Sequence, residues 1–299
     1  MALKILQGIT MNSKNYYSRV RNILIIILFL NLGVSLTKLG YGWYTNSLSI
    51  VSDGFHSLFD GISNVIGIVG IIIASRPPDS EHPYGHVKFE TLASLGIAII
   101  LFFTCFEIFK SAVERLFDPT VPEISMVSFI IIGITICINI VISWFENREG
   151  KRLGSSILVA DSLHTRSDVY GSVAVILGFI AIKMGFVIAD SIVAILIALL
   201  IARTGISIIK SSSDVLLDKA PLESKDIKKI VNALEEVKDC HKIRTRGPKS
   251  SIYVDLHIEL EGCLSLDEAH DISHKVEETL KNSIEGVKDV TVHVDPCNE

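Results

Sequence analysis

The sequence predicts a bundle of six membrane-spanning α-helices followed by a small soluble domain of mixed α and β structure. Two observations support this fold class. The chain of 299 residues is 49% hydrophobic and has a mean hydropathy of +0.46, which is high for a soluble protein. The apolar residues lie mainly between residues 23 and 209, whereas the C-terminal part is rich in charged residues. We therefore predict a transmembrane domain at 1–211 and a soluble domain at 212–299.

Six apolar segments are each long enough to cross a bilayer, which takes about 20 residues in a helix. The Pro77–Pro78 pair separates the second segment from the third, and Pro119 and Pro122 separate the third from the fourth. The six segments lie at residues 22–42, 47–74, 91–116, 123–146, 155–184 and 187–209.

Basic residues predict how these helices are oriented. Most of them fall on one side of the predicted membrane, at Lys4, Lys14, Arg19, Arg21, Arg76, Lys88, Arg148, Lys151 and Arg152. The other side has little more than Arg115 and Lys183. Because cytoplasmic loops are enriched in Lys and Arg, we expect a multi-pass protein of the cell membrane, with both termini and the soluble domain in the cytoplasm.

The soluble domain is predicted to have the element order α-β-β-α-β. Apolar residues recur at helical spacing in 222–237 and 266–280, and the second segment begins with a capping box of Ser265 and Glu268. Strict alternation of apolar and polar residues at 251–260 and 289–296 predicts two strands, with a shorter strand near 241–245. This order is typical of an open α+β sandwich with its helices on one face of the sheet.

Charge and cysteine content exclude two classes of protein. The net charge of −5 provides no basic surface of the kind that binds nucleic acid. The five cysteines include no Cys-x-x-Cys pair, so we expect reduced thiols and not a disulfide framework.

Two of the predicted spans carry the same polar motif, DGFHSLFD at 53–60 and DSLHTRSD at 161–168. Each ionisable residue in a membrane helix costs about 2.5–3.5 kcal/mol, so both motifs require a functional explanation. His56 and Asp60 are four residues apart, as are His164 and Asp168, and each pair shares one helix face. If the two helices face each other, two imidazoles and two carboxylates form a tetrahedral site suited to Zn²⁺.

The charge of these four residues suggests how transport could work. Two aspartates and two neutral histidines carry a charge of −2, which one divalent ion neutralises. In the empty site the carboxylates repel each other, and at least one group is expected to bind a proton. Metal and protons then compete for the same atoms. Asp53 and Asp161, one turn before each histidine, fit either a supporting role or ordinary helix packing.

The loop between the second and third spans suggests a second metal site. It reads PPDSEHPYGH (77–86) and contains Asp79, His82 and His86. Pro83 and Gly85 prevent a regular helix, so helical spacing cannot bring these residues together. A polar loop without metal is the alternative interpretation.

The soluble domain suggests a third cluster. On the predicted strands, alternate residues form one polar face, which includes His257, His293 and Asp295, with His241 nearby. If the strands are neighbours, these side chains meet on one surface. A solvated sheet face is the alternative.

Over essentially its whole length, the chain resembles the cation diffusion facilitator family of metal efflux transporters. The resemblance rests on the two spaced ligand pairs and on the segments YGHVKFE (84–90), LLDKAP (216–221) and TVHVDP (291–296). It implies a homodimeric metal/proton antiporter with a ferredoxin-like cytosolic domain. Histidine at position 56, where well-known bacterial members have aspartate, resembles the zinc-preferring pattern. We therefore expect Zn²⁺ to be the transported ion and a regulatory ligand.

The resemblance also implies a role for individual residues. It implies a transport site of His56, Asp60, His164 and Asp168, and a loop site of Asp79, His82 and His86. It implies a binuclear site at the cytosolic dimer interface of His241, His257, His270, His293 and Asp295. Lys88 and Asp218 match a charge interlock between the membrane and cytosolic halves of the dimer.

Three other functions were weighed. The same transporter could carry Mn²⁺, Fe²⁺, Co²⁺ or Ni²⁺ as its main substrate, since two imidazoles do not separate zinc from cobalt. A membrane metal sensor would bind metal without flux. An intramembrane metalloenzyme is not expected, because catalytic zinc keeps an open coordination position and no His-Glu-x-x-His motif is present.

Overall fold

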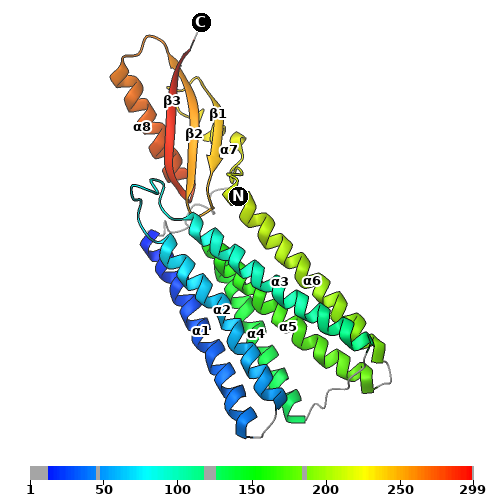
Figure 1. Ribbon diagram of the computed structural model, residues 1–299. Helices are drawn as coiled ribbons and strands as arrows, with labels where there is room; N and C mark the ends of the chain where they lie inside the picture. Colours follow the sequence, from blue (N-terminus) through cyan, green and yellow to red (C-terminus); the bar gives the residue numbers. More distant parts are fainter. Residues whose placement is uncertain (1–12, 45–47, 118–125, 184–186, 298–299) are drawn as a thin grey trace. The chain divides into compact units, whose positions relative to one another are not determined.

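The computed structural model describes residues 13–44, 48–117, 126–183 and 187–297 (Figure 1). Within these ranges, the side chains of Asp53, His56 and Asp60 are among those that lie outside the described part of the structure. The chain divides into two compact units, one spanning Ser13–Ser212 and one formed by the C-terminal residues from Ser213.

The first unit contains six helices over the described residues, as predicted. They are α1 (Ser13–Tyr44), α2 (Leu48–Ala74), α3 (Lys88–Phe117), α4 (Met126–Leu153), α5 (Ser156–Lys183) and α6 (Val187–Leu216). α1 packs against α2, α4 packs against α5, and α3 packs against both α2 and α5. Figure 1 shows these helices running lengthwise through one bundle.

Four of these helices contain a described apolar stretch that is long enough to cross a membrane: α1, α3, α4 and α6. In α2 the described apolar stretch is limited to Gly61–Ala74. In α5, the residues Asp161, Arg166 and Asp168 interrupt the apolar sequence. The two less apolar helices are therefore the two that carry the repeated polar motif.

Three helices extend beyond the apolar segments that predicted them. α1 begins at Ser13 and not near residue 22, α4 ends at Leu153 and not near 146, and α6 ends at Leu216 and not near 209. The added turns contain charged side chains such as Arg19 and Arg148. Hydropathy detects only the part of a helix that suits hydrocarbon, whereas backbone hydrogen bonds continue the helix into polar surroundings.

The helices contact one another closely in an apolar core. The large buried side chains include Leu24, Ile97, Leu101, Ile157, Leu158 and Ile201. A Cβ atom added at Gly70 of α2 would lie 2.3 Å from the Cβ atom of Ala93 in α3, so the two backbones nearly touch. Outward-facing side chains such as Phe29 and Phe103 are exposed, as expected for helices that face lipid.

The first turn of α5 is held by a buried carboxylate of α3. Glu90 accepts hydrogen bonds from the Tyr16 hydroxyl of α1 at 2.9 Å and from the Ser155 hydroxyl at 2.7 Å. It also accepts hydrogen bonds from the backbone N–H groups of Ser156 and Ile157. A carboxylate in this position satisfies the free N–H groups at the start of a helix. Glu90 thus joins three helices at one end of the bundle.

The second unit has the predicted α-β-β-α-β order. Its elements are α7 (Ser224–Val231), β1 (Asp239–Arg246), β2 (Ile252–Glu261), α8 (Leu266–Ser283) and β3 (Val287–Cys297). β2 is the central strand, antiparallel to β1 and parallel to β3. The predicted capping box is confirmed, because Ser265 and Glu268 bond reciprocally at the start of α8.

One face of this sheet is covered by the helices. Along β2, every second residue from Ile252 to Leu260 is buried and packs in one core with Val231 of α7 and Leu280 of α8. The intervening residues of β2 are only partly buried. The opposite face of the sheet is therefore the polar one, where the sequence predicts the third cluster.

The first helix of this unit is shorter than predicted. α7 ends at Val231 and not at Val237. After it, backbone N–H groups bond three residues back, at Leu234 to Val231 and at Val237 to Leu234. These turns keep the apolar side chains of Leu234 and Val237 against the core at a spacing close to that of a helix. The apolar pattern alone therefore could not reveal the end of the helix.

Candidate metal sites

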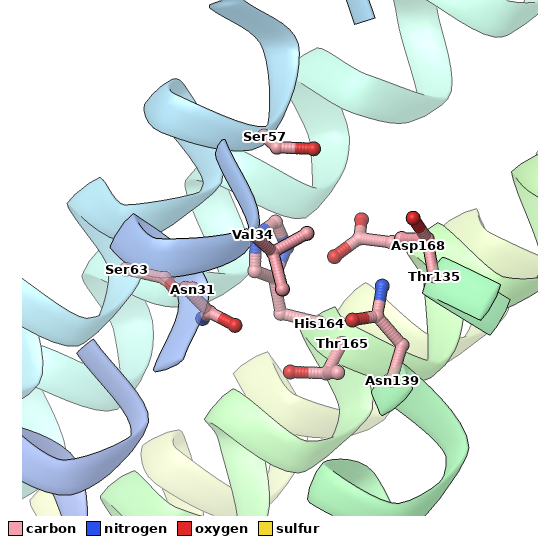
Figure 2. A pocket seen from close by; sticks show the side chains of 9 residues that line it. All are labelled: Asn31, Val34, Ser57, Ser63, Thr135, Asn139, His164, Thr165 and Asp168. Carbon is pink, nitrogen blue, oxygen red and sulfur yellow. The ribbon is translucent and has the colours of Figure 1, made fainter. Parts of the chain in front are cut away.

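A polar pocket lies among the first, second, fourth and fifth helices. Figure 2 shows His164 and Asp168 along α5, with Thr135 and Asn139 on α4 close by. The pocket is lined by Asn31, Val34, Ser57, Ser63, Thr135, Asn139, His164, Thr165 and Asp168. The four-residue spacing thus places both predicted α5 ligands in one pocket.

The imidazole of His164 lacks the partners that buried polar groups normally have. The residue is only 2% exposed, and neither ring nitrogen has a hydrogen-bond partner among the described residues. Leaving a buried polar group unsatisfied costs about 1–3 kcal/mol. A metal ion bound to one of these nitrogens would supply the missing interaction, so the residue fits the predicted ligand role.

The predicted ligands of α2 are His56 and Asp60, whose side chains lie outside the described residues. Their backbone belongs to α2, which packs tightly against α1 here. The Ser35 hydroxyl donates a 2.8 Å hydrogen bond to the carbonyl of Gly54, and Lys38 Nζ donates one of 2.9 Å to Ser57. Ser57, the residue after His56, also lines the pocket. This turn of α2 therefore borders the pocket that contains His164 and Asp168.

A buried hydrogen-bond chain runs beside the pocket. The Asn31 amide donates a 2.9 Å hydrogen bond to Asn64, and the Asn64 amide donates one to the Asp161 carboxylate. On the far side of α5, the Thr165 hydroxyl donates hydrogen bonds to Glu146 at 3.4 Å and to the backbone carbonyl of Asp161 at 3.2 Å. Asp161 and Glu146 are both fully buried. Asp161 thus takes part in a network between helices.

Sequence reasoning did not identify Asn31, Asn64 or Glu146. A signal for Asn64 was present, because it follows Asp60 by four residues and so continues the face that carries His56 and Asp60. No comparable signal marks Glu146. It lies near the end of the fourth apolar segment, where a charged residue reads as a surface residue.

The loop before α3 brings Asp79, His82 and His86 together, with ligand atoms from all three within 4.8 Å of one another. Asp79 Oδ1 is 3.3 Å from Nδ1 of His82, and Asp79 Oδ2 is 3.3 Å from Nε2 of His86. Gly85 has a φ of 81°, a left-handed conformation that glycine adopts without strain. That turn brings His86 back to Asp79 without a helix.

Hydrogen bonds prepare Asp79 for a cation. The backbone N–H of His82 donates to Asp79 at 2.7 Å, and that of Glu81 donates at 3.1 Å. The His82 backbone hydrogen bond is the largest cause that lowers the pKa of Asp79 below its ordinary value. The carboxylate therefore stays ionised and available as a ligand.

The polar face of the sheet gathers a third cluster, of His241, His257 and Asp295, whose ligand atoms also lie within 4.8 Å of one another. Asp295 Oδ2 is 2.9 Å from Nδ1 of His257 and 3.3 Å from Nε2 of His241. Asp295 Oδ1 is 3.2 Å from Nε2 of His293. The hydrogen bond with His257 is the main cause that lowers the pKa of Asp295.

The strand register explains how these residues meet. His241 of β1 lies directly across from His257 of β2, and His257 lies across from His293 of β3. Side chains opposite each other on one face of a sheet are close enough to interact. The alternation of the sequence and the order of the strands therefore place three imidazoles in a row.

Three predicted residues are placed differently. Within one chain, His270 is not with the sheet cluster, but on the exposed side of α8 beside His274. Lys88 begins α3 in the first unit, and Asp218 follows α6 in the second with a φ of 56°. The charge interlock between Lys88 and Asp218 stays a prediction.

The bundle, its buried histidine pocket and the attached α+β domain together define a membrane transporter for metal cations. Residues 24–217 match the model of the cation efflux transmembrane domain, and residues 220–297 match that of the cation efflux protein cytoplasmic domain. The chain belongs to the cation diffusion facilitator family of divalent metal efflux transporters. The predicted family and fold class are confirmed.

Relatives with known names span nearly the whole chain. An uncharacterised transporter of Methanocaldococcus jannaschii, MJ0449, is 38% identical over 91% of this chain and 96% of its own length. The cation-efflux pump FieF of Shewanella oneidensis is 30% identical over 85% and 86%. The manganese efflux system protein MneS of Bacillus subtilis is 28% identical over 89% and 92%.

Among solved structures, the metal-bound C-terminal domain of the CzcD transporter from Thermotoga maritima is 25% identical to this chain. It covers 25% of this chain and 87% of its own, with a TM-score of 0.24.

Proposed function

We propose that the protein exports Zn²⁺ from the cytoplasm in exchange for protons, as a homodimer in the cell membrane with both termini in the cytoplasm. The observation that carries this proposal is the His164 imidazole, which is buried beside Asp168 with both ring nitrogens unsatisfied among the described residues. A buried imidazole without partners costs free energy that a bound cation offsets.

His56 and Asp60 complete the ligand set in this proposal. Two nitrogen and two oxygen ligands suit tetrahedral Zn²⁺. Support comes from Ser57, which follows His56 and lines the same pocket as His164. The four ligands carry a charge of −2 when both histidines are neutral, so one Zn²⁺ leaves the loaded site neutral in a low-dielectric region.

Protons drive the exchange by competing with the metal. An empty site with two carboxylates in a buried pocket retains protons on its ligand atoms. Arriving Zn²⁺ displaces them, since a metal binds only deprotonated ligands. When the pocket opens to the outside, protons return and displace the metal. A gradient of protons directed inward therefore moves Zn²⁺ outward.

Export of Mn²⁺ is the second candidate function, and the same reasoning extends to Fe²⁺, Co²⁺ and Ni²⁺. The pocket lining favours it, because hard cations prefer oxygen ligands. Besides the predicted ligands, the pocket presents side-chain oxygens of Asn31, Ser57, Ser63, Thr135, Asn139 and Thr165. The relative MneS is named for manganese efflux.

The other two clusters are proposed to regulate transport. The Asp79 cluster lies in the loop that leads into α3, where bound metal would order the connection between α2 and α3. The cluster of His241, His257 and Asp295 lies on an uncovered sheet face, where a second copy of the domain can approach. Metal there favours whichever dimer arrangement it fits better.

Flux measurements with purified protein test the proposal. The protein is reconstituted into vesicles, and each divalent ion is supplied with and without a pH gradient. We expect zinc to move uphill when protons move the opposite way. Zinc binding without flux of any ion would identify a sensor. Flux that ignores the pH gradient would identify a facilitator, and faster flux of Mn²⁺ than of Zn²⁺ would favour the second candidate.

A further inference from the structure

α8 carries a pair of histidines outside the sheet cluster. His270 and His274 are four residues apart, so they lie on one face of the helix. Their Nε2 atoms are 3.1 Å apart, and their ring centroids are 4.4 Å apart with an interplanar angle of 88°. Both residues are exposed, so a metal ion can reach them from solution.

The distance between the two nitrogens suits a pair of ligands on one metal ion. With Zn–N bonds of about 2.0–2.1 Å, a separation of 3.1 Å subtends an angle of about 100° at the metal. Tetrahedral and octahedral coordination have angles slightly above and below this value, so either can accommodate the pair. The ring orientations need little change on binding.

Glu277 supports the pair. Its Oε2 atom is 3.5 Å from Nδ1 of His274, and its other carboxylate oxygen pairs with Lys281. A carboxylate beside Nδ1 keeps the hydrogen on that nitrogen, so Nε2 of His274 keeps its lone pair directed at His270. A histidine that binds metal through one nitrogen commonly has such a carboxylate partner at the other.

This pair is separate from the sheet cluster. Val276 and Leu280 of α8 pack in the core against the buried side chains of β2, whereas His257 lies on the alternate face of that strand. The exposed histidines of α8 point away from the core. Within one chain, the sheet thus lies between His257 and His270, and one ion cannot join them.

We propose that His270 and His274 form a metal site on α8, supported by Glu277 and distinct from the sheet cluster. It takes a divalent ion of the zinc, nickel or copper class, with water in the remaining positions, because paired imidazoles do not suit Mg²⁺ or Ca²⁺. With two protein ligands it binds more weakly than the three-ligand sheet cluster, so it fills at higher metal concentration. The proposal does not depend on transport.

Residue-resolved footprinting of the full-length protein in detergent tests the site. Diethylpyrocarbonate modifies free imidazole nitrogens, and mass spectrometry of the α8 peptide reports His270 and His274 separately. During a titration with Zn²⁺, both should become protected with the same midpoint. His274→Ala should raise the midpoint for His270 by at least about tenfold, and Glu277→Gln should raise both midpoints by about tenfold.

The double variant His257→Ala/Asp295→Ala is the matched control, because it removes the sheet cluster and leaves α8 unchanged. It should leave the protection of His270 as in the wild type. If His270 loses its protection in that variant and keeps it in His274→Ala, then His270 serves the dimer-interface site and the proposal is wrong. Absence of zinc protection in the wild type would also overturn it. Zinc flux is measured separately, so failure of the transport proposal would not alter these outcomes.

Discussion

The side-chain amide of Asn64 in α2 donates a hydrogen bond to the carboxylate of Asp161 in α5. Both side chains are buried, and the two residues are 97 positions apart in the chain. Asn31 of α1 donates in turn to Asn64. The two helices that carry the repeated motif are therefore joined by hydrogen bonds beside the pocket that contains His164 and Asp168.

The first prediction concerns this link. Asn64→Leu leaves the buried carboxylate of Asp161 without its donor, so the free energy of unfolding should fall by about 1–3 kcal/mol. The double variant Asn64→Leu/Asp161→Leu removes both polar groups and should cost less than the sum of the single variants. Unfolding in detergent micelles measures these changes. Strictly additive costs would show that the two side chains do not interact.

The second prediction concerns the transport ligands. His56→Ala, Asp60→Ala, His164→Ala and Asp168→Ala should each reduce zinc flux to background, while the protein still folds and forms dimers. Loss of one ligand should weaken binding by more than the roughly 10–100-fold typical of changes outside the ligand shell. Ser63→Ala, which also alters the pocket lining, is the control and should retain flux. Near-normal flux in any one of the four variants would remove that residue from the site.

The third prediction concerns ion selectivity. His56→Asp replaces an imidazole by a carboxylate, which makes the ligand set richer in oxygen and more anionic. Transport should broaden toward Cd²⁺ and toward harder ions such as Mn²⁺. Competition between ions in vesicles provides the measurement, with the wild type in parallel. An unchanged order of preference would show that residue 56 does not determine selectivity.

The fourth prediction concerns helix packing. In Gly70→Ala, the new methyl group would lie 2.3 Å from the Cβ atom of Ala93, and such overpacking costs about 1–3 kcal/mol. Gly40→Ala in α1 is the matched control, because a Cβ atom there meets nothing within 4 Å. It should be neutral or stabilise the helix by up to about 1 kcal/mol. Ala93→Gly should rescue Gly70→Ala. Equal melting temperatures for the two single alanine variants would contradict the close contact.

The fifth prediction concerns pH. The hydrogen bond with His257 lowers the pKa of Asp295 in the folded state. A lowered folded-state pKa contributes stability that is fully present above the unfolded pKa, about 3.9 for aspartate, and is lost as the pH falls through the folded-state value. Without metal, Asp295→Asn should therefore be less stable than wild type at pH 5 and above, and the difference should vanish in stronger acid.

Hydrogen–deuterium exchange of β2 and β3 in the full-length protein measures that difference locally. Lys219→Ala, which alters an exposed ion pair with Asp214, serves as the control and should not affect exchange in the sheet. A difference between wild type and Asp295→Asn that stays constant as the pH falls below the range of aspartate would contradict the pKa shift.

The sequence was sufficient to predict the fold class, because long apolar segments and strict alternation follow directly from burial. It was also sufficient to place His164 and Asp168 on one face of α5, since helical spacing is fixed. The end of α7 could not be predicted, because turns after Val231 keep the same apolar spacing. Glu146 was missed for another reason: its partner Thr165 is in a different helix, and a single sequence does not show which helices pack together.

The loop cluster shows a different limit. Residue types alone suggested that Asp79, His82 and His86 could bind metal, but not that they would meet. They meet because Gly85 takes a left-handed conformation and because two backbone N–H groups fix the Asp79 side chain. Such local turn geometry depends on a few dihedral angles that no periodic pattern records.

The attachment of α5 to Glu90 has a mechanical consequence. Since Glu90 holds the first turn of α5 against α1 and α3, that end is the natural fulcrum for any rocking of the helix. At a rise of 1.5 Å per residue, His164 is about 13 Å from Ser155 and Asp168 is about 20 Å from it. A tilt of about 10° then displaces His164 by about 2 Å and Asp168 by about 3 Å. The helix thus acts as a lever, and its two ligand positions separate unequally from α2 when it swings.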